Sequence, residues 1–167
     1  MSEGKTKRAF LILGSNIEPE QNIPEAINRL QKMVVVQSVS NTWETRAFGS
    51  PGPNFLNTAL MIYTRNNAPD LKYNMIRPME ELMGRVRTTD KNAPRTIDID
   101  ILIYDNEIMD ESIWSRIFLA VPLAEIYPNL EHPVTCKRLW QVADEMRQNI
   151  TIKQRLDVRT RYNALSV

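Results

Sequence analysis

Two aspartates, Asp98 and Asp100, stand within the apolar run Ile97–Ile103. The β-branched residues of this run favour a strand, in which alternate side chains point to the same face of a sheet. At a strand rise of roughly 3.3 Å per residue, the two carboxylates are about 7 Å apart on one face and repel each other unless a cation or a proton intervenes. Mg²⁺, a hard cation that prefers oxygen ligands, would neutralise them. The opposite face should carry four isoleucines: Ile97, Ile99, Ile101 and Ile103.

Basic side chains closely precede these aspartates in the sequence: Arg85, Arg87, Lys91 and Arg95. Carboxylates that hold Mg²⁺ beside guanidinium groups are what a polyphosphate substrate requires. Each pattern alone has a plainer explanation, because an Asp-x-Asp pair is more often a solvated strand face, and two arginines more often belong to a charged loop. The functional interpretation therefore depends on further matching residues elsewhere in the chain.

The composition is that of one ordinary globular domain. The chain has 167 residues, of which 43% are hydrophobic and 25% charged, and its net charge is +1. No bulk charge therefore draws it to nucleic acid or to an anionic membrane. The single cysteine, Cys136, cannot form an intrachain disulfide, and no apolar run has the length of a signal-peptide core or a membrane span. We expect a cytoplasmic protein whose residues 1–8 are disordered.

The expected elements follow the order strand, helix, strand, strand, helix, strand. Short apolar runs predict the strands, and apolar residues at helical spacing predict the helices. The strands are expected at 9–13, 34–43, 54–64 and 97–104, and the helices at 22–33 and 68–83. This order is that of the α+β ferredoxin-like fold, an antiparallel βαββαβ sheet with both helices on one face.

Two further features complete the expected organisation. The second helix should bury Leu71, Met75, Met79, Leu82 and Met83, and Pro78 should kink or restart it. After an irregular stretch, a helix at 137–146 should form a C-terminal helical extension. We therefore expect a single domain over residues 9–146 and a C-terminal tail over residues 147–167.

Several short motifs fall in an order that is similar to a known family. They are Leu13-Gly14-Ser15-Asn16, Trp43-Glu44-Thr45, Phe48-Gly49, Pro53-Asn54-Phe55-Leu56-Asn57, Gly84-Arg85-Val86-Arg87, Pro94-Arg95-Thr96-Ile97-Asp98-Ile99-Asp100-Ile101-Leu102 and Pro122-Leu123-Ala124-Glu125-Ile126-Tyr127-Pro128. With these motifs the chain resembles the 6-hydroxymethyl-7,8-dihydropterin pyrophosphokinase (HPPK) family of folate biosynthesis. The resemblance implies transfer of a pyrophosphoryl group from ATP to the hydroxymethyl oxygen of the pterin, with release of AMP.

The resemblance also implies a role for individual residues. Asp98 and Asp100 would bind two Mg²⁺ ions and act in catalysis together with Arg85 and Arg95. The co-substrate ATP would be bound by Glu80, Arg85, Arg87, Arg95 and Arg116. The pterin would be bound by Gly14, Thr45, Ala47, Phe48, Phe55, Asn57 and Phe118, with Phe55 and Phe118 stacked on its two faces.

One departure from the family leaves a second hypothesis open. The stretch Asp110–Phe118 is several residues shorter than in the family and lacks its histidine. The chain could therefore be a non-catalytic or substrate-altered paralogue that binds pterin or nucleotide. An Asp-x-Asp nucleotide-sugar transferase and an RNA-binding ferredoxin-like domain are less well supported by the sequence. In either leading case we expect small-molecule substrates, a monomer, and no nucleic-acid or membrane partner.

Overall fold

The computed structural model describes residues 5–47, 49 and 51–158. Its strands are β1 (Lys7–Ser15), β2 (Val35–Val39), β3 (Trp43–Thr45), β4 (Phe55–Thr64), β5 (Asp98–Tyr104), β6 (Glu107–Ile108) and β7 (Lys153–Gln154). Its helices are α1 (Pro19–Gln31), α2 (Ala68–Asp70), the π-helix η1 (Leu71–Ile76), α3 (Arg77–Leu82), the 3₁₀ helix η2 (Glu111–Trp114), α4 (Ile117–Ile126) and α5 (Leu139–Asn149). No helix within these ranges has the length and apolar character needed to cross a bilayer.

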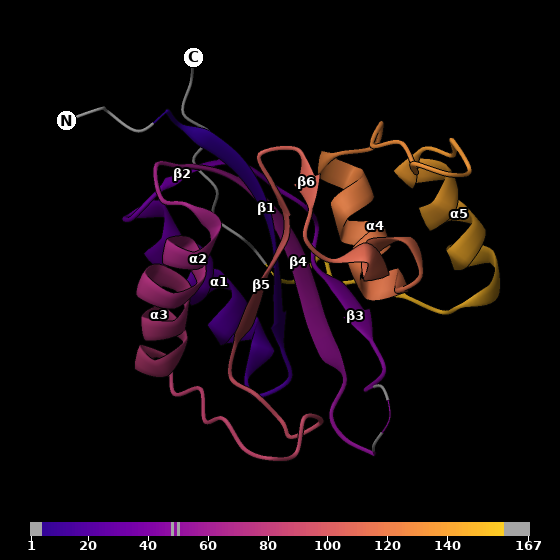
Figure 1. Ribbon diagram of the computed structural model, residues 1–167. Helices are drawn as coiled ribbons and strands as arrows, with labels where there is room; N and C mark the ends of the chain where they lie inside the picture. The colour runs from indigo at the N-terminus through magenta and orange to yellow at the C-terminus, as the bar shows by residue number, and fades with distance from the viewer. Residues whose placement is uncertain (1–4, 48, 50, 159–167) are drawn as a thin grey trace.

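A single antiparallel sheet forms the centre of the molecule (Figure 1). Its strand order is β6-β5-β1-β4-β3-β7, and β2 also pairs with β4. The expected ferredoxin-like order is therefore confirmed. The strand predicted over 34–43 is divided in two, since β2 and β3 pair with successive parts of β4. Between them, Ser40 donates its N–H to the Ala59 carbonyl and accepts the Ala59 N–H at its hydroxyl, at 2.9 and 2.8 Å.

Helices cover both faces of this sheet (Figure 1). One face packs against α1 and the helical segment from α2 to α3, around a core that includes Leu11, Ile27 and Ile99. The other face packs against α4 and α5, around a core that includes Phe10 and Leu123. The two predicted helices share one face as expected, and the C-terminal extension covers the opposite face.

The helix α4 is absent from the sequence-based prediction, which placed irregular structure there. Six of its residues are buried: Ile117, Leu119, Ala120, Val121, Pro122 and Leu123. A helix that lies between the sheet and α5 is apolar on every side, so its sequence shows no helical periodicity. Its internal proline also reads as a helix breaker. These two features together concealed the helix.

The second predicted helix restarts at its proline, as expected. Pro78 stands in the first turn of α3, where a missing backbone N–H costs least, and the wider turns of η1 precede it. The predicted burial of Leu82 is wrong, because its side chain is 76% exposed. The buried stripe instead continues through Ile76 and Glu80, both fully buried.

A bulge in β5 changes the predicted division of its side chains. Phe10 of β1 pairs with Ile103, whereas Leu11 pairs with Ile101, so Leu102 is an extra residue between them. Ile103 is therefore turned to the face covered by α4 and α5. The prediction that it shares a face with Ile101 is wrong. The bulge lies after Asp100, so the common face of the two aspartates is unaffected.

Both chain ends are more ordered than expected over the residues that the structure describes. The strand β1 begins at Lys7, which pairs with Thr64, so the predicted disorder over residues 1–8 is wrong for its last two residues. At the other end, β7 pairs with β3, and Val158 is buried in the core that also includes Ile27 of α1. Residues 150–158, within the predicted C-terminal tail, thus form a strap along the sheet edge. Residues 1–4 and 159–167 lie outside the described ranges.

Candidate active site

Pairing between strands brings an aspartate and an asparagine into one row on the sheet. Gly14 of β1 pairs with Asp98 on one side and with Asn57 on the other. Directly paired residues point to the same face, and two strand spacings separate the outer pair by about 10 Å. A Cβ on Gly14 would stand 3.4 Å from the Asn57 side-chain oxygen, so glycine leaves the floor between them open. Asp100 occupies the same position in the next row, opposite Ile12.

A first cavity lies over this floor. It has a volume of about 420 Å³. Every predicted pterin residue that the structure describes lines it: Gly14, Thr45, Ala47, Phe55, Asn57 and Phe118. The remaining predicted residue, Phe48, lies outside the described residues. Residues far apart in the sequence therefore form one pocket whose lining includes aromatic, amide and charged side chains.

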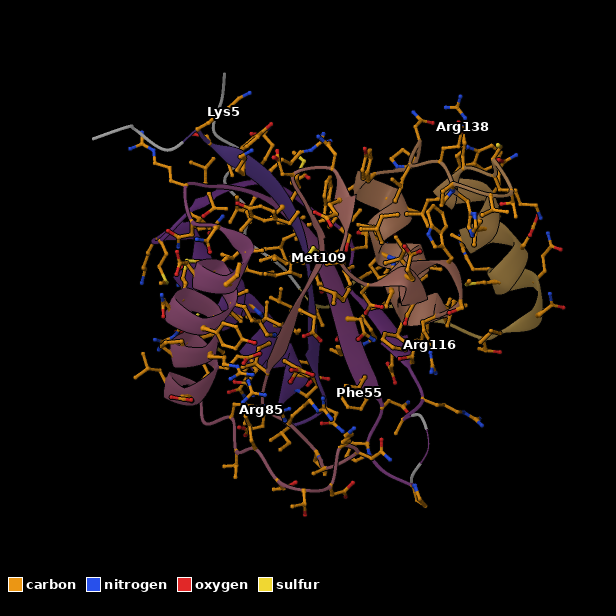
Figure 2. The ribbon with its side chains drawn as sticks, in the orientation of Figure 1. Lys5, Phe55, Arg85, Met109, Arg116 and Arg138 are labelled. Carbon is orange, nitrogen blue, oxygen red and sulfur yellow. The ribbon has the colours of Figure 1, made fainter. Side chains whose placement is uncertain are left out.

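The second cavity adjoins the first and has a volume of about 410 Å³. It is lined by six basic residues: Lys72, Arg77, Arg85, Arg87, Lys91 and Arg95. Arg95, Asp98 and Asp100 line both cavities. In Figure 2, Arg85 after α3, Phe55 of β4 and Arg116 before α4 surround the same end of the sheet. A polyanion in the basic cavity and a flat ligand in the other would therefore meet at a wall with two carboxylates.

Separate cations neutralise the two carboxylates. Arg95 binds Asp98 at 2.5 Å and Arg85 approaches it at 3.8 Å, whereas Lys72 binds Asp100 at 2.9 Å. The charge repulsion expected from the sequence is thus relieved without a metal. Among the described residues, no group of three or more acidic, His or Cys side chains could hold a metal ion. Two carboxylates nevertheless fit Mg²⁺, which commonly takes one or two from the protein and its other ligands from phosphate and water.

The buried carboxylate of Glu80 contacts β5, the strand that carries the two aspartates. One oxygen accepts the Ile99 N–H at 2.7 Å, and the other binds Arg87 at 2.5 Å. Burial raises the pKa of the Glu80 carboxyl, although the hydrogen bond from the Ile99 N–H acts to lower that pKa. Glu80 lines neither cavity. It joins β5, between its two aspartates, to the basic loop that follows α3.

Several arginines that line the second cavity have an N–H donor without a hydrogen-bond partner among the described residues. Arg85 is largely buried, and burial lowers the pKa of its guanidinium. The Nε atoms of Arg77, Arg85 and Arg95 are buried without a partner in the part of the chain that the structure describes. Unpaired buried donors are costly, so these N–H groups are suited to donating hydrogen bonds to an anionic oxygen of a ligand.

The motif around Gly14 has a structural role that the sequence did not reveal. Asn16 accepts the Arg95 N–H at 2.7 Å and donates its own N–H to the Arg95 carbonyl at 3.1 Å. Ser15 donates its hydroxyl to the Thr96 carbonyl at 2.6 Å. The turn after β1 therefore fixes the segment that leads into β5, and with it the base of the Arg95 side chain.

In the first cavity, the polar and the aromatic residues have different partners. The buried Asn57 donates to the Thr45 hydroxyl at 3.1 Å. The Arg95 guanidinium lies 5.8 Å from the centre of the Phe55 ring. Phe118 and Arg116 reach the same cavity from the start of α4. Arg116, predicted to bind ATP, thus lies on the wall of the first cavity and not of the basic one.

Two basic residues that line the second cavity were not singled out from the sequence, namely Lys72 and Arg77. They belong to a helical segment whose apolar stripe was interpreted only as part of the core. Both basic side chains lie outside that stripe, which was the one sign in the sequence that they could have another role. The sequence alone could not show that the segment runs along β5.

The chain matches the sequence model of 7,8-dihydro-6-hydroxymethylpterin-pyrophosphokinase (HPPK) over residues 10–128. It is 33% identical over 146 residues to a 2-amino-4-hydroxy-6-hydroxymethyldihydropteridine pyrophosphokinase of Aquifex aeolicus, covering 81% of this chain and 90% of that protein. It is 37% identical over 134 residues to the folic acid synthesis protein FOL1 of Dictyostelium discoideum, covering 74% of this chain. The chain spans only 20% of that longer protein.

Solved structures agree on the fold. A Plasmodium falciparum HPPK-DHPS crystal structure with pterin and p-hydroxybenzoate superposes with a TM-score of 0.69 at 14% identity, over 92% of this chain and 47% of that chain. The Plasmodium falciparum wild-type structure with pteroate gives a TM-score of 0.65 over 87% of this chain and 43% of that chain. From the family match and the bacterial relatives, the chain belongs to the 7,8-dihydro-6-hydroxymethylpterin-pyrophosphokinase family.

Proposed function

We propose that this chain transfers the terminal pyrophosphoryl group of ATP to the hydroxymethyl oxygen of 6-hydroxymethyl-7,8-dihydropterin and releases AMP. The observation that carries the proposal is the shared wall of the two cavities. Arg95, Asp98 and Asp100 face a basic cavity on one side and an aromatic, amide-containing cavity on the other. A transfer between two small molecules requires their reacting atoms to meet at such a wall.

The first cavity suits a pterin, which is flat and carries hydrogen-bonding groups along one edge. Phe55 and Phe118 supply aromatic faces, and rings gain stability from stacking in addition to buried area. The Asn57 amide supplies a donor and an acceptor together at the floor. A site of this kind should reject analogues that lack the pterin edge groups.

The second cavity suits the triphosphate. Its basic residues would bind phosphate oxygens, with Arg85 and Arg95 beside Asp98 and Lys72 beside Asp100. Asp98 and Asp100 would hold Mg²⁺, and we propose two ions. When bound, these ions would neutralise the phosphate charge and hold the chain of phosphates in a fixed geometry.

In the proposed step the pterin hydroxyl oxygen forms a bond to the β-phosphorus of ATP. The bond from that phosphorus to the oxygen bridging it to the α-phosphorus breaks, and AMP leaves with that oxygen. The hydroxyl proton passes to solvent. Such transfers rely mainly on positioning and charge stabilisation, so no side chain need act as a dedicated base. Arg85 and Arg95 would stabilise the charge that develops on the transferred group.

The shortened stretch before Phe118 remains part of the site. Asp110, Ser112 and Arg116 all line the first cavity. The shortened stretch therefore still contributes to the wall of this cavity. The proposal extends to a monomer in the cytoplasm that acts on ATP and the reduced pterin.

The decisive experiment is incubation of the protein with Mg²⁺, ATP and 6-hydroxymethyl-7,8-dihydropterin, followed by chromatography of both products. We expect AMP and the pterin pyrophosphate to form in equal amounts. Omission of the pterin should abolish AMP formation, which excludes simple hydrolysis. Pterin binding without AMP formation would instead identify the non-catalytic paralogue.

A further inference from the structure

Lys72 forms a direct ion pair with Asp100, the more exposed of the two aspartates. Its ammonium lies 2.9 Å from an Asp100 carboxylate oxygen and 2.6 Å from the Ile99 carbonyl oxygen. The Lys72 side chain is 23% exposed and lines the basic cavity, whereas the Asp100 side chain is 55% exposed. The carboxylate that would bind a metal therefore carries a tethered cation.

The fold explains why a lysine reaches this point. The helical segment from α2 to α3 runs along β5 (Figure 1), and β6 pairs with Ile103 and Tyr104 at the far end of that strand. At Ile99 the backbone groups are bonded by side chains instead, the N–H by Glu80 and the carbonyl by Lys72. The carbonyl bond fixes the ammonium beside Asp100.

We propose that Lys72 is an internal counter-ion that occupies Asp100 while the nucleotide is absent and moves to a nucleotide phosphate when a divalent cation binds. The proposal rests on the proposed function for the identity of that nucleotide. An ammonium and a divalent cation repel each other strongly at one carboxylate, so one must leave before the other binds. Lysine can make this change because its ammonium has three donors. One donor keeps the Ile99 carbonyl while another exchanges Asp100 for phosphate.

Two opposite consequences follow for a variant that lacks the charge. Without Lys72 the nucleotide-free protein should bind a divalent cation more tightly, because the competing ammonium is gone. The same variant should bind metal-free ATP more weakly, because one cation of the basic cavity is lost. A lysine that only supports β5 would not produce this pair of opposite changes.

The test measures Mn²⁺ binding to the nucleotide-free protein by the electron paramagnetic resonance signal of free Mn²⁺. We expect Lys72→Met to tighten Mn²⁺ binding on the order of tenfold, as removal of one adjacent charge of partial exposure implies. Calorimetry with ATP in EDTA should show affinity reduced by roughly the same factor. Lys72→Gln removes the charge but keeps a donor for Ile99, and should behave as Lys72→Met does. Lys72→Arg should resemble the wild type in both measurements.

A matched control is available at Lys137, whose ammonium binds Glu145 at 2.8 Å outside both cavities. Lys137→Met should change neither affinity. Unchanged or weakened Mn²⁺ binding in both Lys72→Met and Lys72→Gln would overturn the proposal. This outcome is independent of AMP formation by the wild type, so failure of the counter-ion and failure of the proposed function are distinguishable.

Discussion

The two aspartates differ in their surroundings although they share one face of β5. Asp98 has a side chain 22% exposed between Arg95 and Arg85, whereas Asp100 is 55% exposed and bound to Lys72. A carboxylate between two guanidiniums has a fixed orientation, and a more exposed carboxylate paired with one lysine is easier for a metal to reach. Asp98 is therefore suited to fix the position of a metal, and Asp100 to complete its coordination.

Removal of either charge should slow turnover strongly while the fold persists. We expect Asp98→Asn and Asp100→Asn each to slow AMP formation on the order of 10³-fold, which is about 4 kcal/mol of lost charge stabilisation. Single-turnover measurements with excess enzyme report the chemical step directly. Circular dichroism should give wild-type spectra for both variants. A rate within tenfold of the wild type in either variant would remove that residue from metal binding.

Phe55 should contribute to pterin binding through stacking and buried area. We expect Phe55→Ala to weaken pterin binding by about 1–3 kcal/mol in titration calorimetry. Tyr73→Ala is a suitable control, because Tyr73 is a 56% exposed ring that packs on Arg77 and does not line the pterin cavity. Equal pterin affinity in the wild type and Phe55→Ala would contradict the stacking role.

Glu80 should give the folded protein a recognisable dependence on pH. Burial raises the pKa of this carboxyl above its ordinary 4.5, so the folded state holds the proton more tightly than the unfolded state. The charge of Glu80 therefore lowers stability progressively as pH rises from 4.5 to the raised pKa. Glu80→Gln keeps an acceptor for the Ile99 N–H and removes the charge. Urea denaturation should show the wild type losing stability relative to this variant as pH rises through the interval, and a pH-independent difference would refute this assignment.

At the scale of elements, the sequence predicted those with a clear periodicity. The alternation and β-branched residues of β4 and β5 gave strands close to those observed, and the stripe through Ile23, Ile27 and Leu30 gave α1. The sequence did not predict elements whose formation depends on packing against the rest of the fold. The helix α4 is apolar on all sides because it is enclosed, and β7 is too short for any pattern to form.

In the candidate site, too, some residues could be predicted from a sequence pattern and others depend on packing between elements. Asp98 and Asp100 were recognisable because a strand places alternate residues on one face, and their neighbouring arginines are close in sequence. Lys72 was not recognisable, because it reaches the site only through the packing of one helical segment along β5. Spacing within one element can be read from a sequence, whereas contact between elements depends on the whole fold.

The strap formed by residues 150–158 should stabilise the sheet edge that carries Thr45. Arg155 binds Glu44 at 2.8 Å and Glu20 at 3.0 Å, and the Arg155 side chain is only 19% exposed. We expect Arg155→Met to lower the free energy of unfolding by about 1–2 kcal/mol, because the partly buried Glu44 loses its cation. This corresponds to a fall of roughly 2–8 °C in melting temperature by calorimetry.

An exposed pair provides the comparison for that variant. Arg29 binds Glu25 one helical turn away, with both side chains at least 40% exposed. Arg29→Met should change stability by no more than about 0.5 kcal/mol. Similar melting temperatures for Arg155→Met and Arg29→Met would show that the strap adds nothing measurable through its arginine.

For the whole molecule, the important relation is between the two cavities. Arg95 lines both, binds Asp98 at 2.5 Å, and lies 5.8 Å from the centre of the Phe55 ring. Its backbone is fixed by Asn16, so only its side chain can respond to a ligand. A nucleotide that drew this guanidinium toward phosphate would change the charge and shape of the first cavity as well.

Binding of the two substrates should therefore be coupled. We expect a non-hydrolysable ATP analogue with Mg²⁺ to raise pterin affinity by about 5–150-fold, the usual range for coupled sites, and linkage requires the pterin to raise analogue affinity equally. Titration calorimetry in both orders measures the two factors. Arg95→Met should remove most of the coupling, because that side chain touches both cavities, whereas Arg87→Met should retain it, because Arg87 lines only the basic one. Full coupling in Arg95→Met would show that Arg95 does not couple the sites. Asp98 and Asp100, the other residues that line both cavities, would then be responsible.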